Sequence, residues 1–224
     1  MRRMPTIVIT GASRGIGLEL AKAYRQDGAT VIAGVRTPEA FPLLGCRPLK
    51  LDVGDAGSVA AFAQALKGEP VDILINNAGI IGPKRQSSHD MDFDGFLETL
   101  AINTLGPLRV TQALLPNLLL ASGARVAVIS SRMGSLSYAT PDRIAYRASK
   151  AAVNKVVQCL ATDLAGKGVA VASLHPGWVR TDMGGAGADI SPPESARGVK
   201  AVVDRLTVAT TGRFWNYSGE ELPW

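Results

Sequence analysis

The 224-residue sequence has two cysteines and two histidines, too few for a disulfide framework or for a metal site built from these residue types. Cys46 and Cys159 also lack the spacing of a metal-binding pair. Proteins of oxidising compartments that rely on disulfides carry more cysteines than this. We therefore expect a cytoplasmic protein that binds no metal.

Long apolar runs and clustered charge are also missing. No window reaches the roughly 18 consecutive apolar residues of a membrane span, and the run Ile7–Ile9 is too short for the core of a signal peptide. The 24 Lys and Arg residues are scattered among 19 Asp and Glu residues, whereas nucleic-acid binding requires a clustered positive patch. The sequence predicts no membrane and no nucleic acid as partner, and its net charge of +5 suits an anionic small molecule.

Short β-branched runs alternate with longer segments of helical periodicity. Strands are expected at 6–10, 30–34, 48–53, 71–76, 125–130, 169–174 and 213–217. Helices are expected near 15–27, 56–67, 92–121, 144–166 and 194–208. Several strand runs are apolar throughout, which is typical of strands covered on both faces. The alternation predicts an α/β fold, a single Rossmann domain over residues 1–224 with a doubly wound parallel sheet of about seven strands.

The segment Thr10–Gly17 follows the first expected strand and opens a helix. Gly11 permits a tight turn, Gly15 lets a phosphate approach the backbone, and Gly17 allows close packing of helix on strand. The helix N-terminus offers unpaired N–H groups to a pyrophosphate. The spacing is G-x-x-x-G-x-G rather than G-x-G-x-x-G, and it favours a dinucleotide-binding turn.

The same turn has a second interpretation. Gly11-Ala12-Ser13-Arg14-Gly15 fits G-x-S-x-G, the nucleophile elbow of serine hydrolases, and His175 lies downstream with aspartates between them. However, an elbow on the first strand leaves no preceding strand to supply a loop for the oxyanion hole. A serine hydrolase stays open as the less favoured alternative.

The end of the second expected strand indicates which dinucleotide binds. An NAD-binding protein carries an acidic residue there for the ribose 2′-hydroxyl, but this strand ends in Arg36. Arg14 in the glycine turn is a second cation, and a guanidinium suits a 2′-phosphate. The pair predicts NADP(H), and Arg36 disfavours an NAD-dependent enzyme that oxidises alcohols.

Several short motifs are distributed along essentially the whole chain. They are Thr10–Gly17, Leu51–Val53, Asn76–Gly79 and His175–Thr181, together with the single residues Asn103, Ser131, Tyr146 and Lys150. This set resembles the motifs of the short-chain dehydrogenase/reductase family, and within it those of the C-factor and sniffer-type carbonyl reductases, and the four single residues match the family's catalytic set. Ser130 precedes Ser131, and the family pattern favours the second serine as the catalytic hydroxyl.

The resemblance also implies a set of binding residues. The implied cofactor contacts are Gly11, Ser13, Arg14, Gly15, Ile16, Gly17, Arg36, Asp52, Val53, Asn77, Ala78, Gly79, Tyr146, Lys150, Pro176, Gly177, Val179 and Thr181. The implied substrate contacts are Ser131, Tyr146 and Trp178. In the family, the residue corresponding to Asn103 kinks its helix and holds a water linked to the lysine. Asp52 can either reach the adenine or cap the following turn, and His175 is interpreted as structural.

Tyr146 and Lys150 are four residues apart on an expected helix, so their side chains share one face. An ammonium about 4 Å from a phenol is worth roughly 4 kcal/mol at an effective dielectric of about 20. That would lower the tyrosine pKa by about three units from its usual value near 10. We therefore expect a lowered pKa for Tyr146, which would donate the proton in carbonyl reduction, while Ser131 bonds the carbonyl oxygen.

The sequence thus predicts an NADPH-dependent oxidoreductase that reduces an aldehyde or ketone to an alcohol. An NADPH-binding sensor or signalling protein without significant turnover is the main alternative. The intact Ser131, Tyr146 and Lys150 set argues against it, because a sensor need not retain proton-transfer residues. The long helices at 92–121 and 144–166 could pair across a two-fold axis, giving a homodimer or homotetramer.

Overall fold

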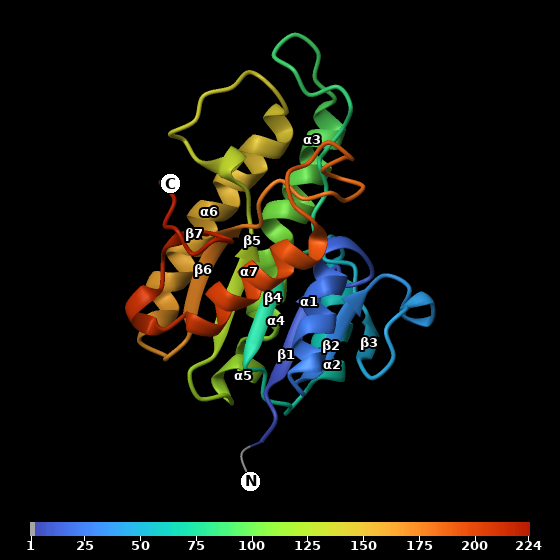
Figure 1. The fold of residues 1–224 in the computed structure, drawn as a ribbon, viewed down its shortest axis with the longest axis vertical. Helices are drawn as coiled ribbons and strands as arrows, with labels where there is room; N and C mark the ends of the chain where they lie inside the picture. The colour runs from blue at the N-terminus through green and yellow to red at the C-terminus, as the bar shows by residue number, and fades with distance from the viewer. Residues whose placement is uncertain (1–2) are drawn as a thin grey trace.

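A parallel β-sheet forms the centre of the computed structural model, which describes residues 3–224 (Figure 1). Within these residues the sheet has seven strands in the order β3-β2-β1-β4-β5-β6-β7, and every neighbouring pair is parallel. The strands are β1 (Thr6–Thr10), β2 (Thr30–Val35), β3 (Arg47–Lys50), β4 (Ile73–Asn76), β5 (Arg125–Ile129), β6 (Ala170–His175) and β7 (Phe214–Asn216). The predicted doubly wound Rossmann fold is confirmed.

Helices cover both faces of the sheet (Figure 1). They are α1 (Gly15–Gln26), α2 (Ala56–Ala65), α3 (Phe93–Leu100), α4 (Gly106–Ala113), α5 (Leu115–Leu119), α6 (Ile144–Ala165) and α7 (Pro192–Arg205). Short 3₁₀ turns occupy Pro38–Ala40, Arg132–Gly134 and Val208–Thr210, and a π-helical turn occupies Ala101–Leu105. Across residues 3–224, no helix is both long and apolar enough to cross a membrane.

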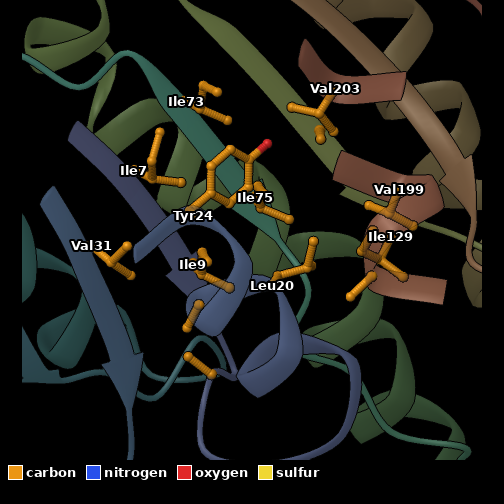
Figure 2. Close-up of a cluster of buried hydrophobic side chains, with 14 of the residues drawn as sticks. Ile7, Ile9, Leu20, Tyr24, Val31, Ile73, Ile75, Ile129, Val199 and Val203 are labelled. Carbon is orange, nitrogen blue, oxygen red and sulfur yellow. The ribbon is translucent and has the colours of Figure 1, made fainter. Parts of the chain in front are cut away.

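The core divides into two layers because alternate strand residues point to opposite faces. Figure 2 shows the layer beneath α1 and α7. Its labelled members are Ile7, Ile9, Leu20, Tyr24, Val31, Ile73, Ile75, Ile129, Val199 and Val203. On the other face, Val8 of β1 packs in a cluster with Phe62 of α2 and Val153 of α6. Burial on both faces explains why the central strands are apolar without alternation.

The expected helix over 92–121 is wrong as a single element. It is divided into α3, the π-helical turn Ala101–Leu105, α4 and α5. Pro107 and Pro116 lie in the first turns of α4 and α5, where a proline loses no intrahelical hydrogen bond. Val110 of α4 and Leu118 of α5 pack in the layer beside the sheet, whereas α3 packs on α6. Apolar residues recur at helical spacing in all three pieces, so the sequence pattern concealed the breaks.

The third strand ends earlier than expected, at Lys50 rather than at Val53. The Asp52 N–H donates to Ser58 Oγ at 2.9 Å, and the Gly54 N–H donates to Asp52 Oδ1 at 2.9 Å. These bonds replace ladder pairing and turn the chain toward α2. The remaining strands lie within one or two residues of their predicted bounds.

Candidate active site

Apart from Tyr146 and Lys150 on α6, the predicted cofactor residues lie at one edge of the sheet, in the loops that follow the parallel strands or in the first turn of α1. They are Gly11, Ser13, Arg14, Gly15, Ile16 and Gly17 after β1, Arg36 after β2, Asp52 and Val53 after β3, Asn77, Ala78 and Gly79 after β4, and Pro176, Gly177, Val179 and Thr181 after β6. The chain changes winding direction between β1 and β4, which are neighbours in the sheet. Open α/β sheets bind ligands at such a point.

The glycine turn packs directly against the end of β4. A Cβ atom at Gly11, whose φ is +66°, would lie 2.9 Å from Ala78 Cα. A Cβ atom at Gly17 would lie 2.5 Å from Asn77 Nδ2 and would also collide with the Gly11 carbonyl oxygen. Both glycines are therefore required by close backbone approach, as the sequence pattern suggested.

Thr10 joins these two loops, although the sequence analysis did not single it out as a site residue. Its Oγ1 accepts hydrogen bonds from the N–H groups of Asn77 and Ala78, each at 3.0 Å. Asn77 Nδ2 in turn donates to the carbonyl oxygens of Thr10 and Gly11, at 3.0 and 3.1 Å. A threonine that ends a strand carries no distinctive sequence signal, so only the structure reveals this role.

Helix α1 begins beneath the glycine turn and has free N–H groups at its N-terminus. Arg14 at the N-cap makes no side-chain capping bond, and within the described chain the first turn holds no acidic residue. The unpaired N–H groups and the positive end of the helix dipole fit a pyrophosphate. Thr181 lies against this turn, since its Cγ2 would be 3.3 Å from a Cβ atom at Gly15.

Two arginines lie where a 2′-phosphate was expected. Arg36 is exposed directly after β2. Arg14 forms an ion pair with Asp182, from the loop after β6, and both side chains are exposed. Asp52 is exposed, and its carboxylate accepts the Gly54 N–H, so it caps the following turn, one of the two roles left open by the sequence.

Tyr146 and Lys150 lie one turn apart on α6, and both are buried, at 8% and 5% exposure. Lys150 Nζ is 5.7 Å from the centre of the Tyr146 ring. It also donates a hydrogen bond to the Ile129 carbonyl oxygen at 2.8 Å, at the end of β5. The sheet edge thereby fixes the position of the ammonium group.

The two serines after β5 have different surroundings. Ser130 Oγ is turned into the protein interior, where it donates to Asn154 Oδ1 at 2.6 Å. Ser131 Oγ accepts the Met133 N–H at 3.1 Å, and its hydroxyl lies close enough to the Tyr146 phenol to lower the pKa of that phenol by hydrogen bonding. Only Ser131 thus stands beside the phenol, in agreement with the preference for the second serine.

Asn103 lies in the π-helical turn and joins α6 to the loop after β4. Its side chain pairs with Ile80 through both atoms, with Oδ1 accepting the Ile80 N–H and Nδ2 donating to the Ile80 carbonyl oxygen, each at 2.8 Å. Nδ2 also donates to Ser149 Oγ at 3.0 Å. A Cβ atom at Gly79 would lie 3.1 Å from Asn103 Oδ1 and 3.6 Å from Lys150 Nζ, so the three residues meet.

The expected lowering of the Tyr146 pKa is wrong in this structure. Burial raises the pKa of the phenol, and this effect outweighs the opposing effects of the Ser131 hydrogen bond and the Arg143 charge. Burial also lowers the pKa of Lys150 to about 8. The sequence argument counted the attraction between ammonium and phenolate but omitted the desolvation of both groups.

The loop after β6 contains the remaining predicted residues, among them Gly177 and Trp178. Gly177 has a φ of +84°, and a Cβ atom there would lie 2.5 Å from Ile190 Cδ1. Trp178 is 53% exposed, with its Nε1 donating to the Gly184 carbonyl oxygen at 2.9 Å. Burial lowers the pKa of His175 to about 4, and Arg132 adds to this effect, so the imidazole is neutral and structural.

Residues 5–189 match the family model for short chain dehydrogenases. The chain belongs to the short-chain dehydrogenase family. C-signal of Myxococcus xanthus is 48% identical over 165 residues, which cover 73% of this chain and 99% of that protein. Among solved structures, NADPH-bound carbonyl reductase from chicken fatty liver matches with a TM-score of 0.90 and 30% identity, covering 100% of both chains. Carbonyl reductase Sniffer of D. melanogaster matches with a TM-score of 0.90 and 31% identity, covering 99% of this chain and 100% of that one. These similarities confirm the family resemblance found in the sequence.

The hydrolase alternative finds no support in this short-chain dehydrogenase fold. Ser13 is exposed in the glycine turn, and among residues 3–224 the buried His175 Nδ1 has no hydrogen-bond partner. The neutral His175 is held at the end of β6, with its Nδ1 atom buried. A serine nucleophile needs a base within hydrogen-bonding reach. Across the described part of the chain, no group of three or more potential ligands could hold a metal ion.

Proposed function

We propose that the protein is an NADPH-dependent reductase that converts an aldehyde or ketone to an alcohol. The observation that carries this proposal is the burial of Tyr146 and Lys150 beside Ser131, at the sheet edge that also presents the glycine turn. NADPH, when bound, supplies a hydride to the carbonyl carbon. The chain's own residues supply the proton and the hydrogen bonds that the carbonyl oxygen needs.

Tyr146 gives its phenolic proton to the carbonyl oxygen as negative charge develops there. Burial raises the pKa of this phenol, which keeps the proton on the oxygen until reaction. Ser131 donates a hydrogen bond to the same substrate oxygen, an interaction that strengthens in the transition state. Lys150 Nζ lies close to Gly79, after β4. In this proposal its ammonium group bonds a ribose hydroxyl of the cofactor and stabilises the negative charge that proton transfer leaves on the Tyr146 oxygen.

The choice of NADPH rests on Arg14 and Arg36, the exposed cations that follow β1 and β2, where a 2′-phosphate is expected. The chicken carbonyl reductase, which matches the whole chain, was solved with NADPH bound, and this supports the same assignment. Replacing Arg36 by Asp should weaken NADPH binding and improve NADH binding, measured by isothermal titration. Lys67, an exposed cation in the turn after α2, provides the control substitution Lys67→Asp.

The proposed activity is tested by an NADPH-consumption screen over aldehydes, ketones, diketones and quinones. We expect turnover of at least one of these carbonyl classes, and loss of that turnover in Tyr146→Phe. Absence of turnover with every class, in a protein that binds NADPH, would contradict the proposal.

The C-signal relative favours a second candidate function, in which the chain acts as a signalling protein that binds NADPH without significant turnover. The two candidates differ in what they require of the phenol. A reductase needs the Tyr146 hydroxyl for each turnover, whereas a sensor needs only the bound cofactor. The same variant, Tyr146→Phe, therefore distinguishes them, provided that NADPH affinity is measured alongside the rate.

We further propose that the chain forms a homodimer or homotetramer through α3 and its neighbouring helices. Phe93 and Leu97 lie one turn apart on α3 and are 73% and 65% exposed, which leaves an apolar stripe in contact with water. Covering such a stripe is the usual reason for pairing across a two-fold axis. Light scattering should give a mass above the 23.4 kDa of one chain, and Leu97→Glu should restore the monomer mass.

A further inference from the structure

Helix α6 carries Tyr146 and Lys150 but does not cap its own N-terminus. The N-cap residue is Arg143, whose side chain makes no capping bond within the described residues. Its φ of +50° lies in the left-handed region, which an arginine adopts at a cost in strain. The first four N–H groups of a helix have no partner within the helix, so those of α6 need partners elsewhere.

Gln86, from the loop between β4 and α3, supplies two of these partners. Its carbonyl oxygen accepts the Ile144 N–H at 3.1 Å, and its side-chain Oε1 accepts the Tyr146 N–H at 3.1 Å. The side chain is 9% exposed, so water does not compete freely for these bonds. The residue that caps the catalytic helix is therefore sixty positions away in the sequence.

The Gln86 amide is held from its other side by its own loop. Nε2 donates to the carbonyl oxygens of Ile81 and Pro83, at 3.0 and 2.7 Å. Because both donors face carbonyl oxygens, Oε1 has to face the Tyr146 N–H. Gly82 closes the loop around this amide with a φ of +88°, and a Cβ atom there would lie 3.4 Å from both amide atoms.

The same loop is anchored to the cofactor side of the site. Ile80 directly precedes Ile81, whose carbonyl oxygen Gln86 contacts. Both the N–H and the carbonyl oxygen of Ile80 are hydrogen-bonded to the Asn103 side chain. Asn77 and Ala78, earlier in the same loop, lie against the glycine turn. The side-chain amide of Gln86 thus hydrogen-bonds both the segment that follows β4, at Ile81 and Pro83, and the backbone N–H of Tyr146.

We propose that Gln86 is a positioning residue, which caps α6 from the loop after β4 and thereby holds Tyr146 in reach of the substrate carbonyl. This inference rests on the proposed function, because it gives Tyr146 the role of proton donor. Without the Gln86 amide, the first turn of α6 loses a partner for the Tyr146 N–H, and the phenol moves with that turn. A displacement of about 1 Å can lower a rate by about 10²-fold.

The test compares Gln86→Met with Asn117→Leu. Asn117, at the opposite edge of the sheet, also holds a loop through its side-chain amide. Its Nδ2 donates to the carbonyl oxygens of Leu66 and Glu69, at 2.5 and 2.7 Å. Both side chains are buried, so both substitutions remove an amide that holds a loop by two backbone carbonyls. Asn117 is remote from Tyr146, so its variant reports the effect of lost stability alone.

We expect kcat of Gln86→Met to fall by about 10- to 100-fold while KM for NADPH stays similar. The alkaline limb of its kcat profile should move to lower pH, because a loosened first turn admits water to the buried phenol. Asn117→Leu should keep the wild-type kcat and pH profile at a temperature where both variants are folded. If Gln86→Met fails to fold, Gln86→Ala, which removes the same amide and introduces no bulk into the buried loop, takes its place with the same expected loss of kcat.

Equal kcat values and pH profiles for the Gln86 variant and Asn117→Leu would overturn the proposal. Tyr146→Phe, measured in the same series, separates this failure from failure of the proposed function. An inactive Tyr146→Phe with a fully active Gln86→Met would reject the positioning role alone. An active Tyr146→Phe would reject the role of Tyr146 as proton donor, and the inference with it.

Discussion

Arg14 in the glycine turn and Asp182 in the loop after β6 form an ion pair between segments 168 residues apart. Both side chains are largely exposed, at 74% and 76%. An exposed ion pair contributes only about 0–1 kcal/mol and is screened by salt. The pair is therefore easily broken by a stronger anion, and in the proposed function Asp182 would compete with the 2′-phosphate of NADPH for the Arg14 guanidinium.

Replacing Asp182 by Asn should accordingly tighten NADPH binding by a few-fold, since an exposed pair of this kind is worth at most about 1 kcal/mol. NADH affinity should not change, because NADH lacks the 2′-phosphate. Isothermal titration at low and high salt measures the affinities for NADPH and NADH, and the gain in NADPH affinity should shrink at high salt. An equal gain for NADH would show that Asp182 acts on some other part of the site.

The buried Lys150 side chain is expected to lower the free energy of unfolding of the protein, although carbonyl reduction requires it. Burial lowers its pKa from 10.5 to about 8, and at neutral pH the folded protein carries this desolvated charge. At 1.36 kcal/mol per unit, Lys150→Met should gain up to about 3 kcal/mol in free energy of unfolding, less the lost bond to Ile129. Carbonyl reduction should be lost in the same variant.

The pH dependence of this gain provides its control. As pH rises from about 8 to 10.5, Lys150 of the folded wild type loses its proton while the unfolded chain keeps it, so the wild type gains stability. The advantage of Lys150→Met, measured by urea unfolding, should therefore be largest below pH 8 and fade by pH 10.5. A constant advantage across this range would exclude the buried charge as its cause.

His175 should make the protein sensitive to acid. Its pKa falls from 6.5 to about 4 in the folded state, so the unfolded chain takes up a proton first as pH decreases. Stability is complete above pH 6.5 and declines until pH 4, by up to about 3 kcal/mol. His175→Phe cannot take up this proton, so its urea unfolding should decline less over the same range. Parallel decline in both proteins would assign the acid sensitivity to other groups.

The sequence predicts most of the sheet because each central strand is a local, apolar run between turn residues. The face shared by Tyr146 and Lys150 is likewise a matter of four-residue spacing. The breaks within 92–121 were not predictable from periodicity, since apolar residues recur at helical spacing in α3, α4 and α5 alike, although α3 packs on α6 while α4 and α5 pack beside the sheet.

Distant contacts and desolvation explain what the sequence left out. Thr10 and Gln86 act on backbone groups that lie dozens of residues away, and nothing in their neighbouring residues marks them. The pKa of Tyr146 depends on how deeply the phenol is buried, which spacing on a helix does not reveal. The family pattern already favoured Ser131 over Ser130, but the physical reason, that the Ser130 hydroxyl is bonded to Asn154 in the interior, required the structure.

The central claim is that Tyr146 donates the proton in carbonyl reduction, and single-turnover reduction of an active carbonyl substrate by Tyr146→Phe tests it most directly. The substitution keeps the buried ring and removes only the hydroxyl. The rate should fall by about 10² to 10⁴-fold, the usual loss for a general acid, while the affinity for NADPH is retained. Reduction at the wild-type rate by a Tyr146→Phe protein that binds NADPH normally would contradict the account.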